Sequence, residues 1–132
     1  MKKVILYFCS VLWILIIASG MVACSGKELT SKTSGNATPD SLYKQDNEID
    51  LFVYQDTAYV NAVTVDWVTE LELKQDKKLG EIERTNVIKK FKDYDATLLD
   101  KGTEIYSVSG RKDIILANIN NMMIPYLAFV EG

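Results

Sequence analysis

Two stretches of the chain place a serine three residues before a lysine, a spacing that can set a nucleophile beside its base. They are Ser41-Leu42-Tyr43-Lys44 and Ser109-Gly110-Arg111-Lys112. The chemistry needs both side chains on one helical turn and a lysine with a lowered pKa. Neither stretch is expected to open a helix, and the Ser-Asp-Asn and Lys-Thr-Gly motifs that accompany such sites are absent from the sequence. We therefore predict no catalytic residue from this pattern.

Two groups of acidic residues lie close enough in the sequence to suggest a metal ion or a pair of catalytic carboxylates. The first comprises Asp46, Glu48 and Asp50, and the second comprises Asp93, Asp95 and Asp100. Carboxylates can bind calcium or act as acid and base in glycoside hydrolysis. Neither group has the calcium-loop spacing, with a glycine at the sixth position and a glutamate at the twelfth. We interpret them as a solvated segment and an Asp-rich turn, and we expect no metal site.

The chain of 132 residues contains no histidine, and its only cysteines are Cys9 and Cys24. The absence of histidine excludes Ser-His-Asp and Cys-His catalysis and histidine-ligated zinc, copper or haem. Carboxylate chemistry, a Ser/Lys pair and plain binding remain. We predict a protein that is not an enzyme and that uses no cofactor.

The elements that would position any of these groups follow an apolar N-terminal segment. Lys2 and Lys3 precede the apolar run 4–17, which is followed by small residues and then by Ala23 and Cys24. This order is typical of a secretory signal, and a cysteine at this place resembles the lipobox of bacterial prolipoproteins. The resemblance implies a signal peptide over residues 1–23, cleavage between Ala23 and Cys24, and attachment of diacylglycerol to the Cys24 thiol.

Two other interpretations of this segment remain open. Val4 to Ala23 is about 20 residues, and at roughly 1.5 Å per residue an uncleaved helix would just cross a hydrocarbon core of about 30 Å. Alternatively, the signal is cleaved without lipidation and Cys24 is an ordinary thiol. All three interpretations place the rest of the chain outside the cytoplasm. The leading one holds it by its lipid at the extracytoplasmic face of the cell membrane.

Residues 24–48 are expected to form a disordered tether behind the lipid. The segment is rich in Ser, Thr, Gly, Asn, Asp and Lys, and its few apolar residues cannot bury enough surface to offset the entropy of ordering. Without residues 1–23 the chain carries 13 basic and 18 acidic residues. This mildly acidic balance gives no electrostatic reason to expect nucleic acid as a partner.

Residues 49–132 are expected to form one small β-rich domain that begins with a hairpin over residues 49–60. Residues 63–74 fit two patterns, a strand of period two or a helix with one apolar stripe. We favour a short helix from Thr64 to Leu71, with Thr64 as its cap, followed by extended chain. The strand alternative stays open.

A polar connection is predicted over residues 74–78, before a half-exposed strand over residues 79–85. Gly80 is a candidate bulge in that strand, since glycine inside a strand pattern often marks one. The strand would form one side of the sheet.

Large apolar side chains are expected to hold the less regular parts of the domain. Residues 86–101 have no clean period, so we predict an ordered, irregular crossing attached to the core by Phe91 and Leu98. Trp67 is expected in the core, because a domain without disulfides depends on its aromatic side chains for packing.

The C-terminal part predicts three strands, over residues 102–108, 113–119 and 124–130. The continuous apolar run of the second predicts a central strand. Pro125 has no N–H donor, which places it on an edge strand or at a strand start. The predicted fold class is α+β and β-dominated, with a small antiparallel sheet or partly open barrel of five to six strands and one short helix.

The order of turn glycines and apolar strand segments along the chain is the basis of a second resemblance to known proteins. The motifs are Trp67, Leu79-Gly80-Glu81-Ile82, Asp95-Ala96-Thr97, Gly102-Thr103-Glu104-Ile105-Tyr106, Asp113-Ile114-Ile115 and Ile124-Pro125-Tyr126. Over residues 49–132 they resemble small uncharacterised lipoproteins of Gram-positive bacteria. These motifs are structural in kind, so the resemblance implies a location and no catalytic residue.

Apolar side chains beside the turn at Asn120-Asn121 are the best candidates for a contact patch. They are Met122, Met123, Ile124 and Tyr126. We expect a membrane-anchored, non-catalytic binding domain whose partner is an extracellular protein or peptide. The alternative is an immunity or inhibitor lipoprotein that sequesters an extracellular peptide or enzyme.

Overall fold

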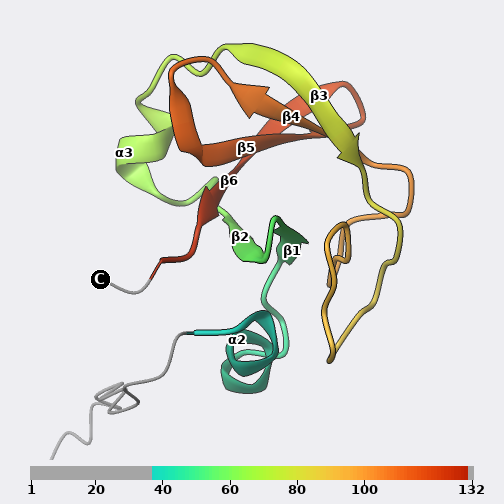
Figure 1. The fold of residues 1–132 in the computed structure, drawn as a ribbon. Coiled ribbons are helices and arrows are strands. Elements are labelled where there is room, and N and C mark those ends of the chain that lie inside the picture. Colours follow the sequence, from blue (N-terminus) through green and yellow to red (C-terminus); the bar gives the residue numbers. More distant parts are fainter. Residues whose placement is uncertain (1–36, 131–132) are drawn as a thin grey trace, which may run out of the picture. The chain divides into compact units, whose positions relative to one another are not determined.

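Six antiparallel strands form a single curled sheet in the order β1-β2-β6-β5-β4-β3 (Figure 1). The strands are β1 Leu51–Tyr54, β2 Thr57–Asn61, β3 Gln75–Glu81, β4 Glu104–Val108, β5 Arg111–Ile119 and β6 Met122–Ala128, and the helices are α2 Pro39–Gln45 and α3 Asp66–Thr69. The computed structural model describes residues 37–130, so the predicted signal peptide, Ala23 and Cys24 lie outside the described residues. The predicted fold class, a β-dominated antiparallel sheet that forms a partly open barrel, is confirmed.

Two tight turns set the register of the hairpins. Gln55 and Asp56 join β1 to β2 with φ of 49° and 58°, and Asn120 and Asn121 join β5 to β6 with φ of 51° and 64°. Positive φ at both central residues is the geometry of a type I′ turn, which matches the right-handed twist of the strands. The hairpin predicted over residues 49–60 and the turn predicted at Asn120-Asn121 are confirmed.

The inner face of the curled sheet carries the main core. Phe52 stacks on Tyr59 with ring centroids 5.5 Å apart, and its ring lies 5.0 Å from that of Tyr126. Burying each such side chain contributes about 1.5–3 kcal/mol. The other buried members of this cluster are Ile82, Ala96, Leu99, Ile105, Ile115 and Ala117.

Two separate clusters cover the outer face of the sheet. Along β1, Phe52 points inward, so its neighbours point outward. The first cluster lies under α3 and comprises Ala62, Val68, Val108, Ile114 and Leu116. The second lies under α2 and comprises Leu42, Leu51, Val53 and Ala58. Each helix therefore covers a different part of the same face.

The folded unit begins earlier than predicted, because α2 lies within the predicted tether. Thr38 caps this helix, and its side chain and that of Ser41 form a reciprocal capping box. Leu42 is only 5% exposed and packs on the outer side of the β1–β2 hairpin. The prediction of disorder up to Glu48 is therefore wrong from α2 onward. One buried leucine and a complete cap are sufficient to order this short helix, because the sheet provides a surface on which the leucine packs.

The helix alternative for residues 63–74 is confirmed, but α3 is shorter than the predicted span from Thr64 to Leu71. Its N-cap is Val65, with no side-chain hydrogen bond, so the prediction of Thr64 as the cap is wrong. Trp67 was expected in the core and is 46% exposed. A helix of one turn directs a single side chain inward, and in α3 that side chain is Val68.

The polar residues 74–78 mostly belong to β3, so the prediction of a connection there is wrong. β3 is an edge strand, and its first four residues are exposed. An edge strand that faces water needs no apolar alternation, and charged side chains protect it from pairing with other chains. The predicted bulge at Gly80 is confirmed by the register shift between Lys78 and Gly80.

The prediction for Pro125 is wrong, because β6 is an interior strand between β2 and β5. The Pro125 carbonyl accepts a hydrogen bond from the Ala62 N–H at 2.9 Å. Its nitrogen lies on the same side of the strand, opposite Ala62, whose carbonyl accepts a hydrogen bond from the Val65 N–H at 3.1 Å instead. The missing N–H of Pro125 therefore leaves no carbonyl of the ladder without a donor. The central position predicted for β5 is confirmed.

The irregular crossing predicted over residues 86–101 is confirmed, and it is attached at two places. Phe91 packs against the cluster under α2, as predicted. Leu98 was predicted as the second attachment and is 56% exposed. The neighbouring Leu99 is 5% exposed and takes that place in the inner core.

Candidate functional site

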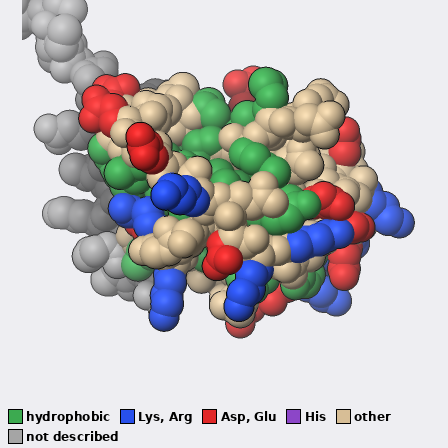
Figure 2. All heavy atoms as spheres, turned by 90° about the horizontal axis from the view of Figure 1, so that it is seen from above, with side chains coloured by type: hydrophobic (Ala, Val, Ile, Leu, Met, Phe, Trp, Pro, Cys, Tyr) green, Lys and Arg blue, Asp and Glu red, His purple; other side chains and the backbone are tan. Residues whose placement is uncertain are grey.

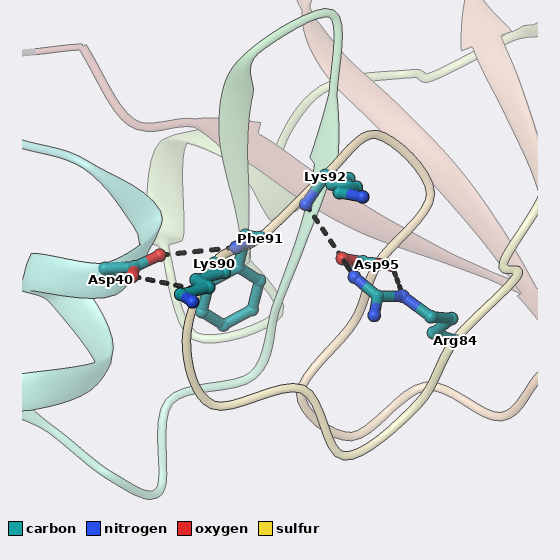
Figure 3. A network of polar contacts seen from close by, with 6 residues as sticks. All are labelled: Asp40, Arg84, Lys90, Phe91, Lys92 and Asp95. Carbon is teal, nitrogen blue, oxygen red and sulfur yellow. Dashed lines mark hydrogen bonds and ion pairs between the residues drawn. The ribbon is translucent and has the colours of Figure 1, made fainter.

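Asp95 is the one acidic residue among the described residues that is buried, with 1% of its surface exposed. Arg84 holds it through two hydrogen bonds, from Nε to Oδ1 at 2.7 Å and from Nη2 to Oδ2 (Figure 3). The Lys92 N–H also donates to Oδ2, at 2.8 Å. These bonds fix the fold of the crossing segment and occupy the carboxylate that catalysis or a metal would need.

Three of the other acidic residues singled out from the sequence serve local structure as well. Asp93 accepts a hydrogen bond from the Asp56 N–H at 3.0 Å. Asp50 Oδ2 accepts one from the Tyr126 hydroxyl at 2.8 Å, and Asp46 accepts one from the backbone two residues later. Within residues 37–130, no three side chains of the ligating types are placed to hold a metal ion.

The serines of the two Ser-x-x-Lys stretches lie in different elements, α2 and the turn between β4 and β5. Ser41 does lie in a helix, contrary to prediction, at the third position of α2. Its hydroxyl donates to the Thr38 carbonyl at 2.8 Å and accepts from the Thr38 N–H at 2.9 Å, so it is committed to the cap. Ser109 lies in the turn between β4 and β5, where its N–H donates to the Lys74 carbonyl at 2.8 Å.

An apolar hollow of about 350 Å³ lies between α3 and the outer face of the sheet. Three large side chains at α3 and its flanks are exposed, Val63 by 45%, Trp67 by 46% and Leu71 by 36%. We call the hollow with these three side chains the α3 groove. The hollow is lined by Val63, Val68, Thr69, Leu71, Leu73, Leu116, Met123 and Pro125. In Figure 2, seen from above, hydrophobic side chains reach the surface between charged ones.

The predicted contact patch is divided between the two faces of β6, so it is wrong as a single surface. Ile124 and Tyr126 face the inner core, where Tyr126 is fully buried. Burial, followed by the charge of Asp50, raises the pKa of Tyr126. Met122 is 61% exposed, whereas Met123 faces the outer side and lines the α3 groove. Alternation along a strand separates residues that are adjacent in the sequence.

The segment that carries α3 and most of the groove lining is acidic up to Leu73, and the exposed Lys74 follows it. Residues 62–73 include no lysine or arginine and three exposed carboxylates, those of Asp66, Glu70 and Glu72. Arg111 lies over the Trp67 ring, 5.3 Å from its centroid. This arginine pairs with Asp113 through hydrogen bonds of 2.9 Å and 2.6 Å, which lower the pKa of Asp113. Arg111 therefore leaves the negative charge of residues 62–73 uncompensated.

A second hollow, of about 660 Å³ and more open, lies along β3 and has a mixed polar lining. Lys78 within it already pairs with Glu81 at 2.9 Å and with Glu104 at 3.1 Å. Gly80 lets the Tyr94 ring approach the strand, since a Cβ at this position would lie 2.6 Å from the ring atom Cε1. Because these groups are used for packing and pairing, the α3 groove is the stronger candidate site.

The sequence carried a signal for the α3 groove that we assigned to the core. Val63, Trp67 and Leu71 recur at helical spacing, which predicts an apolar stripe but not the side it faces. The sheet wall of the groove, with Leu116 and Met123, comes from strands far away in the sequence. Only the topology brings the two walls together.

The helices among residues 37–130 are too short and too polar to cross a lipid bilayer. Comparisons of the chain with protein-family models, with curated proteins and with solved structures found no significant match. A function for this chain therefore rests on its own residues.

Proposed function

We propose that this protein is a lipid-anchored, extracytoplasmic binding domain without catalytic activity. The observation that supports a binding role best is the α3 groove, where Val63, Trp67 and Leu71 remain exposed beside an apolar hollow. Exposed apolar side chains around a concave surface are typical of interaction sites. The side chains of Ser41, Asp50 and Asp95, which could do chemistry, are engaged in hydrogen bonds of the fold, and this supports the absence of catalysis.

The N-terminal sequence supports the anchor. Two lysines, an apolar run and a small residue before Cys24 are the features on which bacterial lipoprotein processing depends. A thioether-linked diacylglycerol on Cys24 would hold the domain at the outer surface of the cytoplasmic membrane.

The anchor is tested by the intact mass of the protein from the membrane fraction of the producing cell. We expect a chain that begins at Cys24 and carries the added mass of a diacylglycerol. A Cys24→Ala variant should lose that mass and leave the membrane fraction. A Cys9→Ala variant is the matched control and should be processed like the native protein. A full-length chain that begins at Met1 and stays in the membrane in both variants would contradict the lipid anchor.

The groove is tested separately by a photo-crosslinking amino acid placed at Leu71 in the full chain, in intact cells. The control carries the same group at Ile88, which is 53% exposed on the crossing segment, away from the groove. We expect crosslinked products from position 71 and none from position 88. Equal crosslinking at both positions would indicate random encounters and would contradict a binding role for the groove.

A further inference from the structure

We propose that the α3 groove binds a cationic peptide segment that inserts a large apolar side chain. This inference rests on the proposed binding function and adds the chemical class of the partner. Its basis is that the groove combines an apolar lining with an acidic rim. Each of these features selects a different part of the partner.

The lining selects an apolar side chain. Thr69 is the one lining residue with a polar side chain, and its hydroxyl already donates to the Asp66 carbonyl at 2.9 Å. The hollow therefore offers no side-chain hydrogen-bond donor, amide or charge to a polar group. Its volume of about 350 Å³ is at the lower end of the range for small-ligand pockets, about 300–1,000 Å³. This size suits one large side chain rather than a whole folded element.

The rim selects positive charge. Asp66, Glu70 and Glu72 are exposed, and within residues 37–130 none of them takes part in an ion pair. By contrast, the partner groups of Lys78 and Arg84 are already used inside the fold. Glu70 and Glu72 adjoin the lining residue Leu71 in the chain, and Asp66 lies one helical turn before the lining residue Thr69. Three unpaired carboxylates beside lining residues raise the local concentration of cations and steer basic ligands toward the hollow.

The same charge disfavours the other occupants of an apolar groove. An anionic membrane surface would be repelled by Asp66, Glu70 and Glu72 instead of attracted. In a two-fold contact with a second copy of the chain, the same acidic rim would face itself across the interface. A peptide segment rich in lysine or arginine is the occupant that gains from both features.

The two neighbouring methionines of β6 provide a built-in test by methyl NMR. Met123 lines the groove, whereas Met122 is 61% exposed on the other side of the strand. The full chain, labelled at its methionine methyl groups and held in nanodiscs of zwitterionic lipid, is titrated with two synthetic peptides. Both peptides carry leucine at the same positions, and the remaining positions are lysine in one and glutamate in the other.

We expect the Lys/Leu peptide to shift the Met123 methyl signal and to leave the Met122 signal in place. The Glu/Leu peptide should bind at least about tenfold more weakly, since each surface charge pair is worth about threefold in affinity. Equal shifts of Met123 with both peptides would overturn the cationic class while leaving the groove as a binding site. A Met123 shift that follows protein concentration alone, or the addition of anionic lipid, would identify a second copy or the membrane as the occupant and would also overturn it.

Variants separate the two features of the groove. A Glu70→Gln/Glu72→Gln double variant should weaken the Lys/Leu peptide about tenfold and leave the Glu/Leu peptide unchanged or slightly tighter. Glu83→Gln, an exposed acidic position outside the groove, is the control and should change neither. Leu71→Ser should weaken both peptides. If neither peptide moves the Met123 signal of the native chain, the inference fails, and the mass and crosslinking experiments decide independently on the anchor and the groove.

Discussion

The two helices that cover the outer face of the sheet are held in different ways. α2 has a complete capping box, and its Asp40 accepts hydrogen bonds from the N–H groups of Lys90 at 2.8 Å and Phe91 at 3.4 Å (Figure 3). α3 has no side-chain cap and rests on the sheet through the buried Val68. Polar bonds to the crossing segment fasten α2 in addition to the buried Leu42, whereas α3 is held by the packing of Val68 and by the contact of Arg111 with the Trp67 ring.

The difference indicates that the α2 side of this small domain mainly stabilises the fold, whereas the α3 side leaves a surface available for binding. On the α2 side, the carboxylates of Asp40 and Asp95 are used to hold the crossing segment, so these two are not free for a ligand. On the α3 side, carboxylates point to solvent and apolar side chains stay uncovered. The regions of a protein with few stabilising contacts are also those from which binding surfaces are drawn.

The largest expected effect is the loss of the buried carboxylate on the fastened side. Asp95→Asn replaces an acceptor of the Arg84 hydrogen bonds by an amide donor, and it should lower the free energy of unfolding by about 2–3 kcal/mol. Urea denaturation of the full chain measures the change. Asp100→Asn is the matched control, since Asp100 is exposed on the same segment, and it should stay within about 0.5 kcal/mol of the native protein. Equal losses in both variants would show that the Asp95 network does not stabilise the crossing.

The second prediction concerns the thin apolar cover. Val68→Ala removes two buried methyl groups beneath α3 and should cost about 2 kcal/mol. It should also abolish the discrimination between Met123 and Met122 in the peptide titration, because α3 loses its contact with the sheet. A cost near zero would mean that α3 is held by something other than this packing.

The third prediction compares the two helix starts directly. Thr38→Ala removes the side chain that caps α2 and should cost about 1 kcal/mol, whereas Thr64→Ala, before the uncapped α3, should have almost no effect. Thermal unfolding of the two variants under the same conditions provides the measurement. An equal effect of both would remove the difference in capping on which the comparison depends.

The smallest effect should appear in the pH dependence. The Tyr106 hydroxyl, 2.5 Å from Glu104, and then Lys78 lower the pKa of Glu104 below its ordinary value of 4.5. A lowered folded-state pKa contributes stability above the ordinary value, and this contribution is lost as the pH falls through the folded value. Stability should therefore decline below about pH 4.5, and less steeply in Tyr106→Phe. An unchanged slope in this variant would show that the hydroxyl does not set the pKa.

Periodicity in the sequence was sufficient to predict those strands that have one buried face and one exposed face. The β1–β2 hairpin and β5 follow from alternation and from apolar runs between turn residues. The exposed first half of β3 could not be predicted in this way. It has no buried face, and its sequence therefore shows no alternation of apolar and polar residues. Thr38 and Pro39 are a typical start of a helix, and they mark the beginning of α2 in the sequence. Its single large buried residue, Leu42, offsets the entropy of ordering only because it packs on the sheet, and the sequence alone does not show that contact.

The site was less predictable than the fold, for a topological reason. The charged and polar candidates were visible in the sequence, but each could find a partner only in three dimensions, as Asp95 does in Arg84. The patch expected at Met122 to Tyr126 combined neighbours in sequence that a strand sends to opposite faces. The stripe containing Trp67 was recognised, but its exposure depends on how short α3 is.

The early start of the folded unit at α2 has a consequence for where the groove can be presented. With a lipid on Cys24, the 13 residues from Cys24 to Asn36 can span at most about 45 Å, roughly half the distance available to a tether that continued to Glu48. A partner held at the same membrane within that half-sphere would meet the domain at an effective concentration on the order of 10 mM. For such a partner, a groove with a dissociation constant of about 1 mM would be occupied most of the time.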